Sequence, residues 1–553
     1  MKKIIASTLM LIMLATFMSA CTGGSSPTPT LSSQPTGSES GDVQNSAEVS
    51  APVAASEINA FVGTSIFGGS LDPVKGGLSY GYSFTNCALL KVDPDSNYIG
   101  DMATDWSISE DSLVYTFELR EGVKFSDGSD FTAEDVVFTY ETVKANQANN
   151  ENVDLTRLAS VEADGDYTVV FTLSEPYSPF FDSTAMLGIV PSDAYDSADF
   201  DQYPIGTGPW KIVQYDVNQQ IIIEANEDYY EGAPEIDKIT LVYMDANVAL
   251  SAASSGTLDI VMVGTDSTNV EIPGMYFQAF DTMDIRMLSL PVLTEQTATT
   301  PDGSEITVGN PVTSDVNVRQ ALSIGIDRET IIQNAMNGIG KPAYGFTDNL
   351  VWASTAQDSD NRREEAKELL ESAGWVDSDG DGIRERDGVK CEFTVYCTET
   401  PRYQLAAAVA QDALELGIQI NAVTATWSDV AQKQNQGAVV WGWGQYSPTV
   451  IQSLFSSEAF LVETYGNVIG FDNSLVDEQI ELALSSSDHD DAIAKWKQAQ
   501  TIANEEYPYL YIVNIEHTYF INDSLDISLE TQIPHPHGHG SPIICNMKDW
   551  KLN

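Results

Sequence analysis

Residues 103–143 read ATDWSISEDSLVYTFELREGVKFSDGSDFTAEDVVFTYETV and contain signals for three local structures in a fixed order. Residues 114–119 are rich in β-branched and aromatic side chains, which predicts a strand. Asp127-Gly128 predicts a turn, because glycine accepts a positive φ and aspartate can bond its own backbone. Thr132, followed three residues later by Asp135, predicts the capped start of a helix. A strand, a turn and a capped helix in this order indicate a mixed α/β unit.

Helix and strand signals alternate along the rest of the chain, so we predict the α/β fold class. We expect paired strands at 208–213 and 220–224, and an extra hairpin within 296–310 that turns at Asp302-Gly303. The predicted amphipathic helices are 361–373, 401–416 and 490–505, of which the first two end just before a glycine.

The first 50 residues have the composition of a secretion signal followed by a tether. Lys2 and Lys3 precede an apolar run over 4–17, and two small residues then precede Cys21. This pattern predicts a lipoprotein signal, with cleavage before Cys21 and lipid on its sulfur; the alternative is an ordinary cleaved signal with an incidental cysteine. Residues 22–50 are mostly small and polar, which is typical of a flexible linker. We therefore assign 1–20 to the signal and 21–54 to the tether, with lipid as the membrane anchor.

Size and charge limit the classes of protein that need to be considered. The remaining chain of about 500 residues exceeds a single hydrophobic core and should divide into lobes. The 26 Lys and Arg residues against 81 Asp and Glu residues give a formal net charge of −55. Such a surface repels nucleic acid phosphates, so we expect no nucleic acid partner. The acidic surface first serves solubility, and a funnel for cationic ligands is the alternative interpretation.

The cysteine pattern argues against a disulfide framework and against zinc. Cys391 and Cys397 lie six residues apart in a strand-like run, and an extended backbone separates them too far for a bridge. An extracytoplasmic setting permits a bridge between more distant cysteines, but we expect buried free thiols at Cys87, Cys391, Cys397 and Cys545. No zinc-ligand spacing is present.

Several motifs together resemble those of one family, the solute-binding proteins of ABC importers for peptides, dipeptides or nickel (family 5). Within the opening stretch the resemblance includes Trp106, 119–120, 122–125, 127–128 and 131–136. The further matching segments, in order, are LDP at 71–73, GTGPWK at 206–211, NEDYY at 226–230, PEIDKI at 234–239, VRQAL at 318–322, IDR at 326–328, WGWG at 441–444 and Trp550. The matches extend from about 70 to 550, which is nearly the whole chain after the tether.

The resemblance implies a two-lobed clamp of the type II periplasmic-binding-protein class, with an additional small α/β domain. The first lobe would combine 55–95, 200–285 and 510–553, the additional domain would span 96–199, and the second lobe would span 286–509. Two chain crossings, near 280 and 510, would form a hinge. The family resemblance further implies an extracytoplasmic, lipid-anchored receptor that delivers its ligand to separate permease and ATPase subunits. We expect a monomer.

The ligand of this family lies between the lobes, and the resemblance places two walls there. One wall would include Phe67 and Gly68, although Phe67 could equally be a core residue at a strand end. The other wall would include Trp427 and the 443–448 loop, with Trp443, Gln445, Tyr446 and Ser447 as contacts. We interpret Trp441 as a core residue on the same strand.

Both charged anchors of the peptide-binding pattern are missing at their expected positions. Ser447 stands where relatives often carry an aspartate for the ligand ammonium, and 438–440 lacks an arginine for the ligand carboxylate. A peptide remains the leading ligand because peptides dominate the family. The alternatives are nickel or a metal chelate, and an oligosaccharide stacked on Trp427 and Trp443.

Two further patterns are candidate metal sites. Asp377, Asp379 and Asp381 have calcium-loop spacing, but Gly388 occupies the twelfth position where such loops carry a bidentate glutamate. We predict at most a structural calcium ion at 377–388, and no other cofactor. His535, His537 and His539 alternate at a spacing that can bind nickel, copper or zinc. The alternative for these histidines is a loop in which they bond backbone carbonyls.

Enzyme classes find no support in the sequence. It lacks G-x-S-x-G, H-E-x-x-H and Walker A motifs, so we predict a binding protein and not an enzyme. Two alternatives from other classes remain at this point. One is a surface sensor or adhesin without an importer, and the other is a secreted hydrolase that uses scattered carboxylates.

Overall fold

The computed structural model describes residues 56–531 and 542–553, apart from 68, 78–82, 96, 151, 197, 347, 349, 355–359, 445 and 446. Residues 55–553 form one compact unit. None of the helices in the described ranges combines the length and apolar character needed to cross a bilayer. The predicted lipidation site and several predicted ligand residues lie outside the described residues: Cys21, Gly68, Gln445, Tyr446, His535, His537 and His539.

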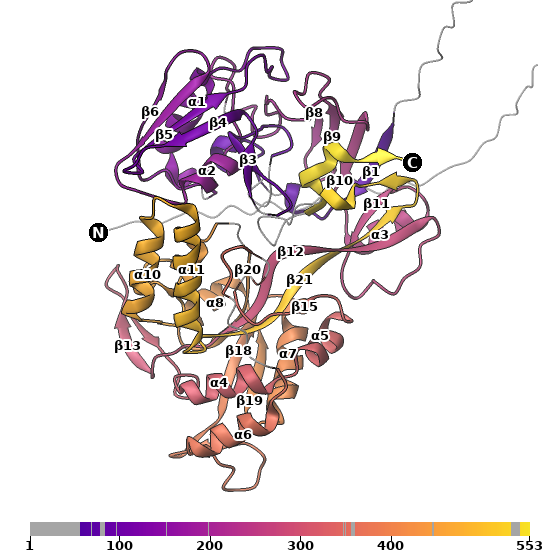
Figure 1. Cartoon of the computed structure of the whole chain (residues 1–553). Coiled ribbons are helices and arrows are strands. Elements are labelled where there is room, and N and C mark those ends of the chain that lie inside the picture. The colour runs from indigo at the N-terminus through magenta and orange to yellow at the C-terminus, as the bar shows by residue number, and fades with distance from the viewer. Residues whose placement is uncertain are drawn as a thin grey trace, which may run out of the picture. The chain divides into compact units, whose positions relative to one another are not determined.

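One large mixed sheet runs through this unit (Figure 1). Within the described residues it has eleven strands, and β15 (Lys341–Pro342) pairs with β21 off the main path. The path is β19 (Gln419–Thr424), β18 (Glu392–Cys397), β20 (Ala438–Trp443), β12 (Met275–Ser289), β21 (Tyr509–Asn522), β11 (Ile260–Val263), β1 (Glu57–Phe61), β10 (Lys238–Val242), β9 (Gln220–Ala225) and β8 (Trp210–Asp216). The predicted strand pair at 208–213 and 220–224 is confirmed as antiparallel β8 and β9.

The two longest strands, β12 and β21, join the two ends of this sheet. They pair antiparallel, and the register shifts between Asp281, opposite Glu516, and Ile285, opposite Asn514. A shift of this kind is a β-bulge, which bends a strand and increases its twist. Figure 1 shows both strands crossing the middle of the unit side by side. The chain crossings expected near 280 and 510 fall within these strands.

Separate hydrophobic cores lie at the two ends of the sheet, so the unit has two lobes. One core includes Ile58 of β1, Ile239 of β10 and Tyr519 of β21. The other includes Val395 of β18, Val440 of β20 and Ile512 of β21. Four helices contribute to the second core: α4 (Val316–Gly325), α5 (Arg328–Met336), α6 (Arg363–Ser372) and α7 (Thr400–Leu414). Helix α3 (Ala246–Ser254) packs on the sheet next to β1 and β11.

A smaller antiparallel sheet contains the stretch that opened the sequence analysis. Its order is β4 (Ala103–Ile108), β5 (Val114–Leu119), β7 (Thr168–Leu173) and β6 (Leu158–Ala163), and α1 (Ala133–Ala145) packs on it. The predicted turn has Gly128 at φ +91°, and the Asp135 carboxylate accepts the Thr132 backbone N–H at 2.8 Å. The Tyr140 ring of α1 packs edge-to-face against Phe171 at 4.7 Å between centroids. All three local predictions for 103–143 are confirmed.

The other predicted elements also form. Helices α6, α7 and α11 (His489–Asn504) match the three predicted amphipathic segments to within two residues at each end. The extra hairpin is β13 (Gln296–Thr299) with β14 (Glu305–Val308), and Gly303 in its turn has φ +87°. None of the four described cysteines forms a disulfide; Cys87, Cys391 and Cys397 are buried as expected, whereas Cys545 is only half-buried.

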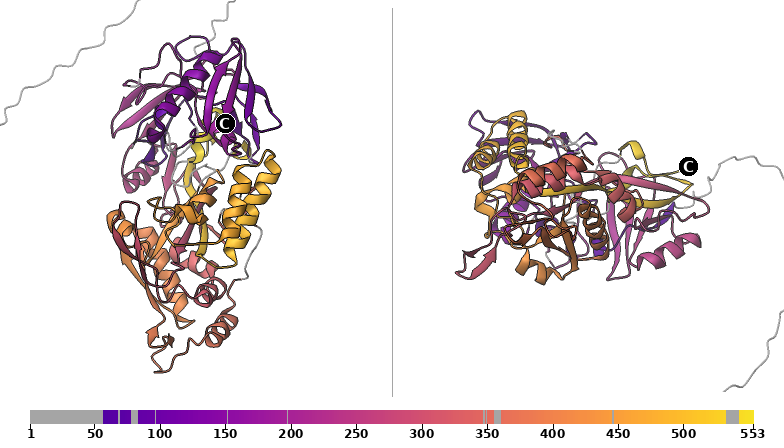
Figure 2. Two further views of the ribbon diagram at one scale, coloured as in Figure 1. Left: turned by 90° about the vertical axis from the view of Figure 1, so that its left-hand side faces the viewer. Right: turned by 90° about the horizontal axis from the view of Figure 1, so that it is seen from below.

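The remaining elements connect these layers (Figures 1 and 2). The helices are α2 (Phe180–Met186), α8 (Trp427–Lys433), α9 (Thr449–Phe455) and α10 (Ser474–Leu484). The short strand pairs are β2 (Leu90–Val92) with β3 (Tyr98–Gly100), β16 (Glu385–Arg386) with β17 (Val389–Lys390), and β22 (Leu525–Asp526) with β23 (Lys551–Leu552). The domain boundaries implied by the resemblance stay a prediction, although the small sheet with α1 and α2 lies entirely within 96–199.

Candidate functional site

Four aromatic rings form a continuous cluster in the second lobe, here called the aromatic wall: Trp427, Trp441, Trp443 and Tyr465. The ring centroids of Trp427 and Trp441 are 5.8 Å apart, and those of Trp441 and Trp443 are 6.4 Å apart. Tyr465 contacts both Trp427 and Trp441, at 6.0 and 5.6 Å. Trp441 is 4% exposed, as the interpretation as a core residue expects, whereas Trp427 is 44% exposed. The wall therefore has a buried base and an exposed aromatic face.

Local capping fixes the exposed member of the wall. Trp427 is the first residue of α8, and Thr426 is its N-cap. The Thr426 hydroxyl accepts the Asp429 backbone N–H at 3.1 Å, and the Asp429 carboxylate accepts the Thr426 N–H at 3.1 Å. This reciprocal pair satisfies backbone donors that have no partner inside the helix. Trp427 therefore sits at a defined helix start next to Trp441 of β20.

Two arginines converge on β20 beside the wall. Arg286 of β12 pairs in register with Gly442, which lies between Trp441 and Trp443. Arg402 of α7 donates from Nη1 to the Val440 carbonyl at 2.8 Å, and its Cζ lies 5.5 Å from the Trp427 ring centroid. A Cβ at Gly442 would collide with the Arg286 guanidinium and lie 3.0 Å from Arg402 Nη2. Glycine at 442 thus leaves the space that both guanidinium groups use.

Each arginine has an acidic partner. The Asp284 carboxylate, fully buried, accepts from Arg286 Nη1, and Glu399 accepts from Arg402 Nε at 2.7 Å. Burial, with the nearby Arg286 charge as the next cause, lowers the pKa of Arg402. Oδ1 of Asp284 is buried and has no hydrogen-bond partner among the described residues. Four charged groups are therefore held beside the wall, at the place where β12 passes from one lobe to the other.

Ser447, which the sequence analysis predicts to contact the ligand, lies after the C-terminal end of β20 and just before α9. Its hydroxyl donates to Asp182 of α2 at 2.5 Å, and the Tyr98 hydroxyl donates to the other carboxylate oxygen of Asp182. Asp182 is 8% exposed, and burial raises its pKa. A carboxylate therefore lies next to Ser447, although it comes from a distant part of the chain.

The structure places the other predicted residues as follows. Phe67 is buried in the core of the first lobe, and its ring packs edge-to-face on Tyr243 at 5.4 Å. The sequence left open whether Phe67 is a core residue or a ligand contact. The structure shows Phe67 in a core, and contact between Phe67 and a ligand stays a prediction. Trp443 is half-buried within the wall.

The acidic loop brings together a slightly different set of carboxylates from the one the spacing predicts. Oxygens of Asp377, Asp379 and Glu385 lie within 4.8 Å of one another, whereas Asp381 forms an ion pair with Lys390. Glu385, on β16, was not among the predicted ligands, although it occupies the ninth position of the loop, which is a ligand position in calcium loops. Asp377 also accepts the Gly380 and Gly382 N–H groups, at 2.7 and 3.0 Å. Calcium binding at this loop stays a prediction.

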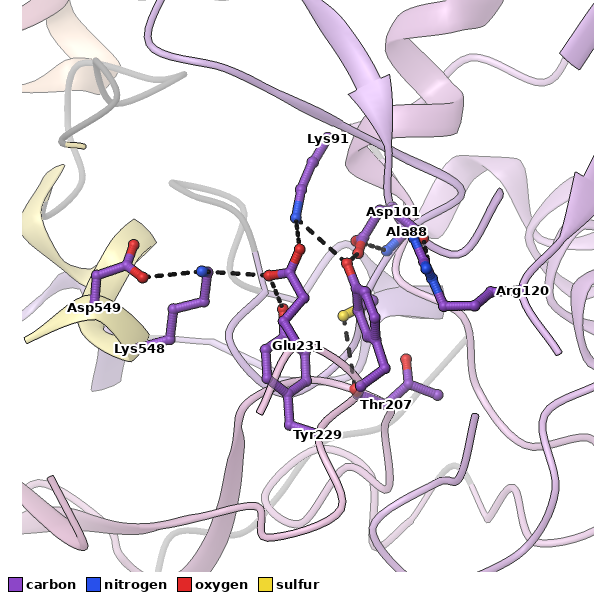
Figure 3. A network of polar contacts seen from close by, with 11 residues as sticks. Ala88, Lys91, Asp101, Arg120, Thr207, Tyr229, Glu231, Lys548 and Asp549 are labelled. Carbon is purple, nitrogen blue, oxygen red and sulfur yellow. Dashed lines mark hydrogen bonds and ion pairs between the residues drawn. The ribbon is translucent and has the colours of Figure 1, made fainter. Parts of the chain in front are cut away.

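A second polar network lies away from the wall and joins Asp101, just after β3, to Glu231 and Lys548 of the first lobe (Figure 3). The Tyr230 hydroxyl donates to buried Asp101 at 2.6 Å, and Lys91 donates to Glu231 at 2.6 Å. Burial raises the pKa of Asp101 to about 6. Burial alone would also raise the pKa of Glu231, but its bonds to Lys91 and the charge of Lys548 outweigh burial and lower it to about 2. Beside the network is a cavity of about 220 Å³, lined by Lys91, Asp101, Trp210 and Met547 among others.

Sequence reasoning missed Arg286, Arg402, Asp284 and Asp182. A weak signal existed for Arg286, which interrupts the apolar run Ile285, Met287 and Leu288. Asp182 and Ser447 are 265 residues apart, and no local pattern relates them.

Comparisons with known proteins agree with this fold. The model of the bacterial extracellular solute-binding proteins, family 5 (middle region), matches residues 97–458. The oligopeptide-binding protein AppA of Bacillus subtilis (strain 168) is 30% identical over 460 residues, which is 78% of this chain and 80% of AppA. The nickel-binding periplasmic protein of Escherichia coli (strain K12) is 26% identical over 446 residues, 77% of this chain and 82% of that protein.

The crystal structure of NikZ from Campylobacter jejuni in complex with Ni(L-His) has a TM-score of 0.70 at 22% identity, and the match covers 90% of this chain and 99% of NikZ. The predicted two-lobed α/β clamp fold is therefore confirmed. The chain belongs to the bacterial extracellular solute-binding proteins, family 5.

Proposed function

We propose that this protein is the receptor of an ABC importer, and that it captures a peptide and delivers it to permease and ATPase subunits encoded as separate chains. The observation that carries the proposal is the aromatic wall, with Trp427 44% exposed beside the Arg286 and Arg402 guanidinium groups. Flat aromatic faces bind apolar side chains, and guanidinium groups bind carboxylates. The 30% identity to AppA supports a peptide as the ligand.

The proposed mechanism is capture followed by closure of the two lobes. β12 and β21 cross between the lobes side by side, and the bulge between Asp281 and Ile285 provides a bend. A ligand that touches both lobes stabilises the closed form by the difference between its affinities for the two forms. The ligand is released unchanged, so we propose no catalysis.

Arg286 and Arg402 are an alternative to the arginine that the sequence lacks at 438–440 for binding a peptide carboxylate. The segment 438–440 contains no arginine, yet Arg402 is hydrogen-bonded to the carbonyl of Val440 in that segment. We propose that Arg286 and Arg402 together supply the positive charge that a peptide carboxylate requires. The buried Asp284 carboxylate, which accepts from Arg286, holds the Arg286 guanidinium in the orientation that this requires.

The decisive experiment identifies the ligand directly. Native mass spectrometry of the purified protein should show a copurifying peptide, and calorimetry with peptide pools should give binding heat. Trp427→Ala should weaken peptide binding about tenfold, as for an aromatic anchor worth about 1–2 kcal/mol. Tyr203→Ala, which removes a comparably exposed ring (42%) far from the wall in sequence, is the matched control. Absence of copurifying ligand and of heat with both peptide pools and Ni²⁺ would contradict the proposal.

Nickel, free or as a chelate, is the second candidate, favoured by the 26% identity to the nickel-binding periplasmic protein. Heat with Ni²⁺ or Ni(L-His) and none with peptides would favour it. The calorimetric comparison therefore separates the two ligands in one experiment.

We further propose membrane attachment through lipid on Cys21. The signal-like sequence before this residue supports it. Cys21→Ser should move the expressed protein from the membrane fraction to the soluble extracytoplasmic fraction. Equal membrane recovery of both forms would contradict a lipid anchor.

A further inference from the structure

Asp182 links two parts of the molecule that the β12 and β21 crossing separates. It lies on α2, next to the small four-stranded sheet, and accepts the Ser447 hydroxyl at 2.5 Å. Ser447 lies between β20 and α9 in the second lobe. The partner on the other oxygen of Asp182 is the hydroxyl of Tyr98 on β3. The carboxylate is thus bonded on one side within its own part of the fold and on the other side across to the second lobe.

A second pair of hydrogen bonds crosses at the same place. Ser178 donates its backbone N–H to the Leu484 carbonyl at 2.8 Å and its hydroxyl to the Ala483 carbonyl at 2.8 Å. These carbonyls belong to the last turn of α10, where backbone acceptors lack partners inside the helix. The inter-lobe contact is therefore defined by Ser178 and Asp182 on one side and by Ser447, Ala483 and Leu484 on the other.

Hydrogen bonds from hydroxyl groups stabilise the buried Asp182 carboxylate, so the loss of one of them should weaken this contact. Asp182 has no lysine or arginine within ion-pair distance among the described residues. The nearest basic group recorded is His489, whose ring lies 5.8 Å from that of Tyr98. A buried carboxylate is costly unless it is hydrogen-bonded, and bonds to a charged acceptor are stronger than neutral ones. The Ser447 hydroxyl therefore contributes more here than a hydroxyl at an exposed position would.

The surroundings leave some room beside the carboxylate. A cavity of about 30 Å³ is lined by Tyr98, Asp182, Trp352, Pro448, His489 and Trp496, from both sides of the contact. This space is large enough for a water molecule. The contact is thus polar and leaves a small space at Asp182, although buried apolar residues of α2 and α9 on its two sides belong to one hydrophobic core.

We infer that Asp182 is a positioning residue of the receptor: its carboxylate holds Ser447, at the head of α9, when the lobes are together. The inference rests on the proposed function, because Ser447 is a predicted ligand contact. Asp182 would then strengthen ligand binding without touching the ligand. It supplies a carboxylate next to the position where the sequence showed only a serine.

A double-mutant cycle tests the inference. Asp182→Asn and Ser447→Ala should each weaken the binding of a peptide that copurifies with the wild-type protein, by about tenfold, and the double variant should lose no more than either single variant. Ser447→Thr keeps the hydroxyl that donates to Asp182 and should lose less affinity than Ser447→Ala. Asp154→Asn is the matched control, since Asp154 also accepts a tyrosine hydroxyl, from Tyr177 at 3.1 Å, but within its own domain. Additive losses, or unchanged affinity in both single variants, would overturn the inference.

Hydrogen exchange without ligand separates this inference from the proposed function. In a peptic fragment covering residues 175–182, the Ser178 amide should exchange faster in Asp182→Asn than in wild type, with Asp154→Asn unchanged. If no peptide binds the wild-type protein but this difference appears, the proposed function fails and the inter-lobe contact stands. If peptides bind and the variants match the wild type in affinity and exchange, the inference alone fails.

Discussion

Asp101 and Asp182 are both buried aspartates that accept a tyrosine hydroxyl, yet their surroundings differ. Asp101 lies near Lys91, and the same network continues through Glu231 to Lys548 (Figure 3). Among the residues that the structure describes, the hydrogen-bond donors to Asp182 are two hydroxyl groups, those of Tyr98 and Ser447. The Asp101 network ties the C-terminal segment and the loop after β9 to the β2–β3 pair, and none of these described members lies in the second lobe (286–509), so they need not separate when the lobes open. The Asp182 contact crosses between lobes, where a receptor must be able to open.

The largest effect is expected from Asp101→Asn. Burial raises the pKa of Asp101 from 3.8 to about 6, so the folded protein holds a proton that the unfolded chain releases between these values. Stability is therefore lost as the pH rises from about 4 to 6, and an uncharged asparagine avoids this loss. Relative to wild type, the free energy of unfolding of Asp101→Asn should increase by about 3 kcal/mol between pH 3.5 and pH 7.5. Urea unfolding at several pH values measures it, and a pH-independent difference would contradict it.

Glu231→Gln should give the next largest effect. The Glu231 carboxylate bridges Lys91 and Lys548, at 2.6 and 3.3 Å, and its pKa of about 2 is below the ordinary 4.5. Its contribution is therefore present above pH 4.5 and is lost as the pH falls toward 2. Since the side chain is about one-third exposed, solvent reduces the effect, and we expect a loss of about 1–2 kcal/mol at pH 7. Glu227→Gln, on the same loop but in no recorded ion pair, serves as the control. Equal unfolding midpoints for the two variants would contradict the bridging role.

Replacing Tyr230 and Tyr98 by phenylalanine, one at a time, compares the contributions of Asp101 and Asp182 to stability directly. Tyr230→Phe removes the hydroxyl that donates to Asp101, and Tyr98→Phe removes the one that donates to Asp182. Without ligand, we expect Tyr230→Phe to lower the free energy of unfolding by about 1.5 kcal/mol and Tyr98→Phe by less than half of that. Chemical denaturation of the two variants side by side measures the difference. The reverse order would mean that the Asp182 contact is as permanent as the Asp101 network.

The smallest effect is expected from Asp182→Asn in the absence of ligand. Because the contact between Asp182 and Ser447 forms only part of the time without ligand, replacing the Asp182 carboxylate should change the unfolding free energy by less than about 0.5 kcal/mol, although it shortens the time that the contact spends formed. A loss of several kcal/mol in ligand-free protein would show that the inter-lobe contact persists when no ligand is bound.

The parts of the fold that the sequence predicts are those built from neighbours in the chain. The turn at Gly128, the cap at Thr132 and the hairpin at Gly303 each depend on residues within a few positions, and all three form as expected. The exposed position of Trp427 depends on the local cap at Thr426. Such signals act before any tertiary contact and can be found in a single sequence.

The parts that it does not predict depend on pairings over long separations. The guanidinium beside Val440 comes from α7, and the one beside Gly442 comes from β12, whose register against β20 no local pattern fixes. The family pattern led us to look for an arginine within 438–440, whereas the fold supplies one through space. Phe67 shows the reverse, since it matches a family position in sequence but is buried against Tyr243.

The continuity of β12 and β21 also bears on how the protein melts. Leu510 and Ile512 of β21 belong to one core, whereas Tyr519 and Ile521 belong to the other, and β12 likewise contributes Leu288 to one and Phe280 to the other. If one lobe unfolded alone, parts of β12 and β21 would leave the sheet while the rest of the same strands stayed in the core of the folded lobe. Heating should therefore give a single cooperative calorimetric transition, and not the two separate ones expected of domains joined by a flexible linker.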